Sequence, residues 1–228
     1  MKKRSKRFKK ILDISKDKKI ETIDEAIKKV KSNCSAKFDE SIDISLCLNL
    51  KQKKEEVTLR TSVNLPNGNG KKIKVAVLCE DSKTKEAKES GADLYESEKI
   101  INDINNRKIK FDKLIATPAM MPKMGKLGKI LGPKGLMPNP KLGTVTNNLK
   151  SIVKAIKSGQ IEIKNDENGN LAASIGKKSF PDNKIKENLE VFLDTLKKEK
   201  PQGIKGDFIL SAYLTSTMGV SYKLKLAK

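Results

Sequence analysis

The stretch MMPKMGKLGKILGPKGLMPNPKLG, residues 120–143, is the most unusual part of the chain, with five Lys, five Gly and four Pro but no acidic residue. Glycine lets a backbone approach phosphate groups closely, and lysine neutralises their charge. Composition alone therefore leaves two interpretations open, a solvated basic loop or a phosphate-binding segment. In the second interpretation the cations are Lys123, Lys126, Lys129, Lys134 and Lys141.

The chain alternates between strand and helix patterns on either side of this stretch. Residues 75–79 and 113–116 are short apolar runs, typical of strands that are buried on both faces of a parallel sheet. Residues 82–89, closed by Gly91, and residues 147–159 have the pattern of helices. This alternation predicts a small doubly wound α/β layer.

The chain ends have a different, one-sided pattern. Thr22 and Glu25 have capping-box spacing and predict a helix that runs to about Ser32. Apolar residues then alternate with polar ones over 42–50 and again over 59–65, which predicts two strands, expected to be antiparallel neighbours.

The last third of the chain repeats this character. We expect a hairpin over 160–175 that turns at 166–170, then a helix with its apolar stripe over 185–196, then a strand from 208 that could rejoin the first sheet. The turn-rich segment 66–70 and Gly159 are the candidate domain boundaries.

Charge and composition narrow the function. The 228 residues include 49 Lys and Arg against 28 Asp and Glu, a net charge of +21 that points to a polyanionic partner. No apolar run approaches the length of a membrane-spanning helix, so a membrane is not expected as partner. The basic start of the chain lacks the pattern of a secretory signal, which favours the cytoplasm.

Enzyme and cofactor chemistry find little support. The chain has no His and only three widely spaced Cys, which argues against a metal site and removes the commonest general base. The segments 68–70 and 176–179 do not have the glycine spacing of a nucleotide-binding loop. A nucleotide-dependent enzyme is therefore the weaker hypothesis, and no cofactor is expected.

The order of residues in 120–143, with Ala116-Thr117-Pro118 before it and Thr144-Val145-Thr146 after it, closely resembles the signature of the ribosomal protein L-one family. The resemblance continues through segments 37–41, 64–68, 176–180 and 216–219, and it covers residues 20–226. It implies a split α+β domain made of residues 1–66 and 160–228, which binds RNA, and an inserted doubly wound, Rossmann-like α/β domain made of residues 67–159.

The resemblance also implies the function. A member of this family is a structural, non-enzymatic constituent of the large ribosomal subunit that binds ribosomal RNA in the mobile stalk, beside the exit site. Its expected further partners are exit-site transfer RNA and a messenger RNA segment of its own operon, through which it represses translation. We expect it to be cytoplasmic, in the ribosome, and a monomer when free of it.

The family's contacts, transferred to this chain, give the expected site. The RNA-binding residues are Lys37, Phe38, Lys164, Ser211, Thr217, Met218 and Gly219, and the five lysines of 120–143 form a secondary basic loop. Phe38 and Met218 offer apolar surface to sugars and bases, and Gly219 allows close backbone approach. The alternatives are that Phe38 is a core aromatic and that 217–219 is an ordinary turn. The chain departs from the family pattern over 50–61.

Overall fold

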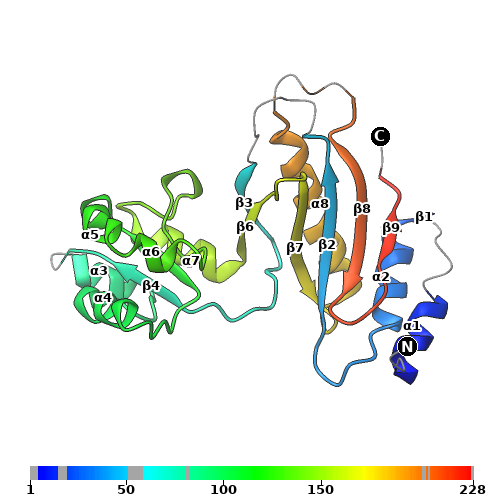
Figure 1. Ribbon diagram of the computed structural model, residues 1–228, viewed down its shortest axis with the longest axis horizontal. Coiled ribbons are helices and arrows are strands. Elements are labelled where there is room, and N and C mark those ends of the chain that lie inside the picture. The colour runs from blue at the N-terminus through cyan, green and yellow to red at the C-terminus, as the bar shows by residue number, and fades with distance from the viewer. Residues whose placement is uncertain are drawn as a thin grey trace. The chain divides into compact units, whose positions relative to one another are not determined.

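The computed structural model describes residues 5–14, 20–50, 59–80, 83–201, 204 and 206–226. The chain divides into two compact units. Unit 1 comprises Met1–Gly70 and Ile163–Lys228, and unit 2 comprises Lys71–Glu162. The prediction of mixed α/β structure is confirmed, because helices accompany both a mixed and a parallel sheet (Figure 1).

Unit 1 draws its elements from both ends of the chain. In chain order they are α1 (Lys6–Ile14), β1 (Ile20–Glu21), α2 (Ile23–Ser32), β2 (Ser41–Leu48), β3 (Arg60–Asn64), β7 (Asn170–Lys177), α8 (Asp182–Lys198), β8 (Ile209–Ser216) and β9 (Tyr222–Leu224), and β6 (Gln160–Lys164) crosses the boundary to unit 2. The predicted capping box starts α2, since Thr22 Oγ1 accepts from the Glu25 N–H and a Glu25 carboxylate oxygen accepts from the Thr22 N–H.

A five-stranded sheet in the order β1-β9-β8-β2-β7 is the framework of unit 1. Only the β1–β9 pair is parallel among its described pairs. Burial alternates strictly along β2, and its buried residues Ile42, Ile44, Leu46 and Leu48 face the side on which α2 and α8 lie (Figure 1). Asp43, Ser45 and Cys47 point to the other face and are partly exposed. One side of the sheet thus carries the core, and the other presents small polar side chains.

Two expected strand pairings are wrong. β3 is not a neighbour of β2, because β7 and β8 occupy both hydrogen-bonding edges of β2, and β3 instead pairs with β6. The turn expected at 166–170 does form, closed by the Asp166 N–H, which donates to the Asn170 carbonyl at 2.8 Å. Its two strands nevertheless enter different sheets, β6 with β3 and β7 with β2.

The return of β8 to the first sheet is confirmed, with one change of phase. A bulge opposite Cys47 and Leu48 places Leu210 at the surface, 56% exposed, although its even number would put it in phase with the buried Ala212 and Leu214. In the turn 166–170, Gly169 allows the backbone to come close to the end of β2. A Cβ at this position would lie 2.9 Å from the Leu48 carbonyl oxygen, and the φ of Gly169 is +80°.

Unit 2 has a parallel strand pair at its centre. Its elements are β4 (Val75–Leu78), α3 (Thr84–Glu89), α4 (Ser97–Asn105), β5 (Lys113–Ala116), η2 (Pro118–Met120), α5 (Met121–Gly125), α6 (Gly128–Leu131), η3 (Pro140–Leu142) and α7 (Leu149–Ser158). Single bridges extend the β4–β5 pair at Leu94 and at Val145. Val75 and Val77 pack with α7 on one face, and Ala76 and Leu78 pack with α4, α5 and α6 on the other. The strands are therefore buried on both faces, as their continuous apolar runs predict.

Candidate nucleic-acid interface

The register of the five-stranded sheet brings three distant loops together at one of its ends. Ile42, near the start of β2, lies opposite Ser216, the last residue of β8, and Ser41 lies opposite Lys177, the last residue of β7. The loop before β2 and the loops after β7 and β8 therefore leave the sheet at the same end, here called the loop end. Five of the seven residues expected to bind RNA, Lys37, Phe38, Thr217, Met218 and Gly219, lie in these loops.

The loop end presents an apolar surface beside a positive charge. Phe38 is 54% exposed and Met218 is 43% exposed, and Lys37 is exposed as well. The alternative interpretation of Phe38 as a core aromatic is therefore wrong. Large apolar side chains in this position can stack on bases and pack on sugars, while a neighbouring ammonium group contacts phosphate.

A buried carboxylate connects the two loops that carry Phe38 and Met218. Glu40 is completely buried, its Oε1 accepts from the Ala36 N–H at 2.9 Å, and its Oε2 accepts from Ser216 Oγ at 2.8 Å and from the Met218 N–H at 3.1 Å. Burial alone would raise the pKa of Glu40, but these hydrogen bonds outweigh it and hold the pKa below its ordinary value of 4.5.

Sequence reasoning did not single out Glu40 as a site residue. The signal that could have found it is its phase, because Glu40 continues the even-numbered series of Ile42 and Ile44 and so belongs to the buried face. A carboxylate that is buried in this way requires hydrogen-bond donors from its surroundings. Those donors come from segments that only the fold brings together.

Thr217 and Gly219 have roles within the protein. The Thr217 hydroxyl accepts from the Ser41 N–H at 3.0 Å and donates to the Ser41 carbonyl at 3.3 Å. A Cβ on Gly219 would lie 2.3 Å from Ser216 Oγ, so only glycine fits there without a shift of Ser216. Both residues shape the turn, and Met218 between them is the one that projects apolar surface.

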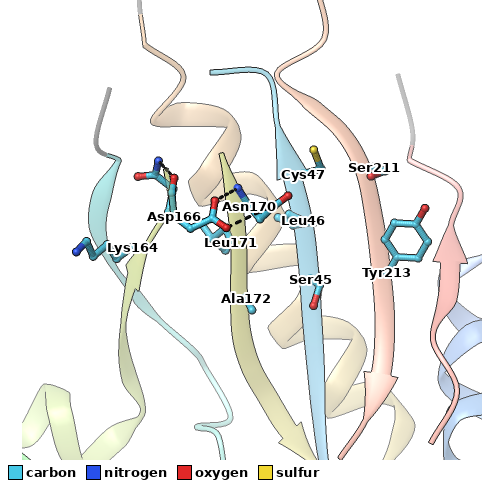
Figure 2. A pocket seen from close by; sticks show the side chains of 11 residues that line it. Ser45, Leu46, Cys47, Lys164, Asp166, Asn170, Leu171, Ala172, Ser211 and Tyr213 are labelled. Carbon is cyan, nitrogen blue, oxygen red and sulfur yellow. Dashed lines mark hydrogen bonds between the residues drawn. The ribbon is translucent and has the colours of Figure 1, made fainter. Parts of the chain in front are cut away.

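The other two expected residues, Lys164 and Ser211, line a pocket of about 620 Å³ away from the loop end (Figure 2). Its lining is formed by Ser45, Leu46, Cys47, Lys164, Asn165, Asp166, Asn170, Leu171, Ala172, Ser211 and Tyr213. Cys47 lies opposite both Ser211 and Asn170 in the sheet, so the pocket occupies the polar face of β7, β2 and β8. The expected contacts thus fall at two places of unit 1.

Asp166, the acidic residue in the lining of this pocket, already accepts hydrogen bonds from its own turn. Asp166 accepts from the Asn170 N–H at 2.6 Å and from Asn170 Nδ2 at 3.1 Å, and these bonds lower the pKa of Asp166 (Figure 2). The Asp166 carboxylate therefore serves to stabilise the turn 166–170. Lys164, Ser45, Ser211 and Tyr213 remain as polar groups that can reach a ligand.

The stretch 120–143 of unit 2 contains the two short helices α5 and α6, joined and followed by turns, where its composition suggested a loop. Met124, Leu127 and Leu131 are buried and anchor α5 and α6 in the core. All the lysines of the stretch lie outside, exposed to solvent, namely Lys123, Lys126, Lys129, Lys134 and Lys141. Within the described residues none of them forms a salt bridge. The stretch thus exposes five positive charges while its apolar side chains are buried.

The described part of the chain offers neither a metal site nor a membrane-spanning helix. It contains no group of three or more His, Cys, Asp and Glu residues that could hold a metal ion. None of its helices combines the length and the apolar character needed to cross a membrane. The surfaces described above are suited to a polyanion that also offers flat apolar groups.

Comparisons with known proteins agree with this chemistry. A family model described as the ribosomal protein L1p/L10e family matches residues 28–220. Large ribosomal subunit protein uL1 from Pelagibacter ubique is 56% identical over 225 residues, 98% of each chain. The protein of the same name from Rickettsia bellii is 47% identical, with 89% of this chain and 84% of the relative covered. The one from Kosmotoga olearia is 46% identical, with 98% and 97% covered.

Proposed function

Because the chain belongs to the ribosomal protein L1p/L10e family, we propose that it is a structural constituent of the large ribosomal subunit, where it binds ribosomal RNA in the mobile stalk. It is not an enzyme, since the family is one of structural ribosomal proteins. Its place is the cytoplasm, within the ribosome. When free of the ribosome it is a monomer.

The observation that carries the proposal is the loop end of the sheet in unit 1. There Phe38 and Met218 are exposed together with Lys37, and a buried carboxylate holds the loops on which they lie. An RNA that folds into a defined shape can place unstacked bases and sugars against such a surface. Lys164 and Ser211, at the pocket, are the second contact region of the same unit.

Charge supplies affinity, and shape supplies selection. The net charge of +21 draws the protein to any RNA, because each neutralised phosphate releases counterions. Lysine provides most of this charge, and it acts on phosphate as a point charge without the planar fork of arginine. Selection of one RNA site therefore depends on the fit of the Phe38 and Met218 surface.

Unit 2 has the second role in the proposal, assistance in the movement and release of exit-site transfer RNA. The five exposed lysines of 120–143 support it, since they lie on short helices and turns whose apolar side chains are buried in the core of unit 2. Lysines of this kind contact phosphates without reading sequence. They can bind a transfer RNA backbone and release it again.

Repression of its own operon is the remaining part of the proposal. A messenger RNA segment with the shape of the ribosomal site would bind to the same loop end and compete with the ribosomal RNA. The support is that Phe38, Met218 and Lys37 lie at one end of the sheet, where two RNAs of the same shape would compete for them. Competition between the two RNAs for one protein molecule tests this part directly.

Binding to total large-subunit RNA at moderate salt, followed by footprinting, tests the main proposal. Protection of one cluster of stem-loops, with at least about hundredfold preference over an unrelated hairpin, is the expected result. Uniform weak protection that disappears as salt is raised would mean that the chain is a generic basic protein and that the proposed site is wrong.

A further inference from the structure

We propose that Glu40 is the positioning residue of the RNA-binding surface: its buried carboxylate fixes the loop of Phe38 and the turn of Met218 in one binding-competent arrangement. This inference rests on the proposed function and extends it, because Glu40 itself is completely buried and offers no surface to RNA. Its effect on binding passes through the two loops that it holds.

The hydrogen bonds of Glu40 cross from one end of the sequence to the other. Oε1 accepts from the Ala36 N–H at 2.9 Å, on the loop that leads to Phe38. Oε2 accepts from the Met218 N–H at 3.1 Å and from Ser216 Oγ at 2.8 Å. Its backbone carbonyl accepts from the Lys178 N–H at 2.8 Å, which adds the loop after β7. One residue therefore connects all three loops at the loop end.

A carboxylate suits this position better than any neutral side chain. Its two oxygens are acceptors only, and the three groups that reach them, the N–H groups of Ala36 and Met218 and the Ser216 hydroxyl, can all donate. Hydrogen bonds to an ionised acceptor are roughly twice as strong as neutral ones. The anion also lies under the surface, so it does not present its charge to phosphate as an exposed glutamate would.

Holding the loops before RNA arrives reduces the entropy cost of binding. A loop that must be ordered on association loses conformational entropy with each side chain that becomes immobilised. Phe38 lies two residues before Glu40 in the sequence, and the Met218 backbone N–H donates directly to the Glu40 carboxylate. Loss of the carboxylate should therefore weaken selective binding while the sheet and its core remain folded.

The test uses Glu40→Gln in the full-length chain. Glutamine keeps the size of the side chain but turns an NH₂ group toward either the Ala36 N–H or the Met218 N–H, so one of these bonds is lost. We expect affinity for the footprinted ribosomal RNA to fall about tenfold, and affinity for an unrelated hairpin to stay within about twofold. Glu21→Gln is the matched control, because Glu21, in β1, is also buried, and its carboxylate forms an ion pair at 2.5 Å with Lys29 of α2. It should change neither affinity by more than about twofold.

A double-mutant cycle separates positioning from a general structural role. In a background that carries Phe38→Ala and Met218→Ala the surface has nothing left to position, so Glu40→Gln should cost less than about twofold further. A further tenfold loss in that background would show that Glu40 acts only on overall folding, and would overturn the inference. Hydrogen exchange of the Met218 amide should accelerate at least about tenfold in Glu40→Gln and remain unchanged in Glu21→Gln.

Ser216→Ala is the second variant, in case Glu40→Gln does not fold. It removes one donor to Oε2 and leaves the carboxylate in place, and a selective loss of about threefold or more is expected. A wild-type chain that fails to select the ribosomal RNA would overturn the proposed function and this inference together. A wild-type chain that selects it, with Glu40→Gln or Ser216→Ala equally selective, would overturn the inference alone.

Discussion

Asn188 Oδ1, at the middle of α8, accepts a hydrogen bond at 3.1 Å from the backbone N–H of Asn67, which lies 121 residues earlier in the sequence. The Asn188 amide nitrogen donates to the carbonyl oxygens of Gly68 and Ile175, each at 2.8 Å. Asn188 is fully buried. Its side chain thus ties segment 66–70, β7 and α8 of unit 1 to one another.

Asn188→Ala should destabilise unit 1 by about 2–3 kcal/mol, because it leaves the buried Ile175 carbonyl and the partly buried backbone groups of Asn67 and Gly68 without their partner. Denaturant unfolding measures this change. Asn183→Ala in the first turn of α8 is the control, since Asn183 is exposed, and it should change stability by less than about 0.5 kcal/mol. If Asn188→Ala changed the free energy of unfolding as little as Asn183→Ala does, the hydrogen bonds of Asn188 would contribute nothing to the stability of unit 1.

Met218→Asp should weaken specific RNA binding by about 3 kcal/mol or more. The variant removes apolar contact from a close-fitting surface and adds a negative charge that faces phosphates. The 43% exposure of Met218 lets the fold tolerate the change, which circular dichroism should verify. The measurement is a titration of the footprinted RNA and of an unrelated hairpin at two salt concentrations.

Lys126→Ala in the basic stretch 120–143 of unit 2 is the control for this experiment. It also removes positive charge, but it should cost about 1 kcal/mol or less and act alike on both RNAs. Equal losses for Met218→Asp and Lys126→Ala on both RNAs would mean that only net charge matters and that the site assignment is wrong.

Unit 2 should be dispensable for selective affinity. A chain of residues 1–70 joined to 160–228 by a short glycine linker keeps every expected contact of unit 1 as well as the Asn67–Asn188 bond. It should retain most of the affinity for the footprinted RNA and lose only a few phosphate contacts. A loss above about 3 kcal/mol in a folded protein would contradict the assignment of RNA binding to unit 1.

The stability contributed by Glu40 should depend on pH in a definite direction. Its pKa is lowered in the folded protein, so the contribution is present above the ordinary value of 4.5 and is lost as pH falls through the lowered value. We expect Glu40→Gln to be less stable than wild type by about 1–3 kcal/mol near neutral pH, and the difference to shrink below about pH 4. Unfolding of both proteins by denaturant between about pH 3 and pH 7 checks this. A difference that grows toward acid pH would have the wrong sign.

Local patterns predicted those parts of the fold that depend on local interactions. The spacing of Thr22 and Glu25 predicted the start of α2, and strict alternation predicted β2, because capping and one-sided burial act within a few residues. Alternation tells which face of a strand is buried but not which strand lies beside it. The pairing of β3 with β6 was missed for that reason.

The helical turns of 120–143 had a signal that composition concealed. Met124, Leu127 and Leu131 recur at helical spacing, and all three are buried, but the abundance of Gly and Pro favoured a loop. Glu40 was not predicted as a site residue, for a different reason. Its partners at 36, 216 and 218 are assembled by the sheet register, which no local pattern contains.

The central place of β2 between β7 and β8 also determines the order in which the chain can fold as it is synthesised. Residues 41–48 emerge early, yet both edges of that strand stay unpaired until residues 170–177 and 209–216 have been made. Unit 2 is continuous in sequence and has all its partners before then. It can therefore fold first, as a unit, during elongation. Until residues 209–216 have been made, the unpaired edges of β2 need protection from other chains, because an unpaired strand edge is a template for aggregation.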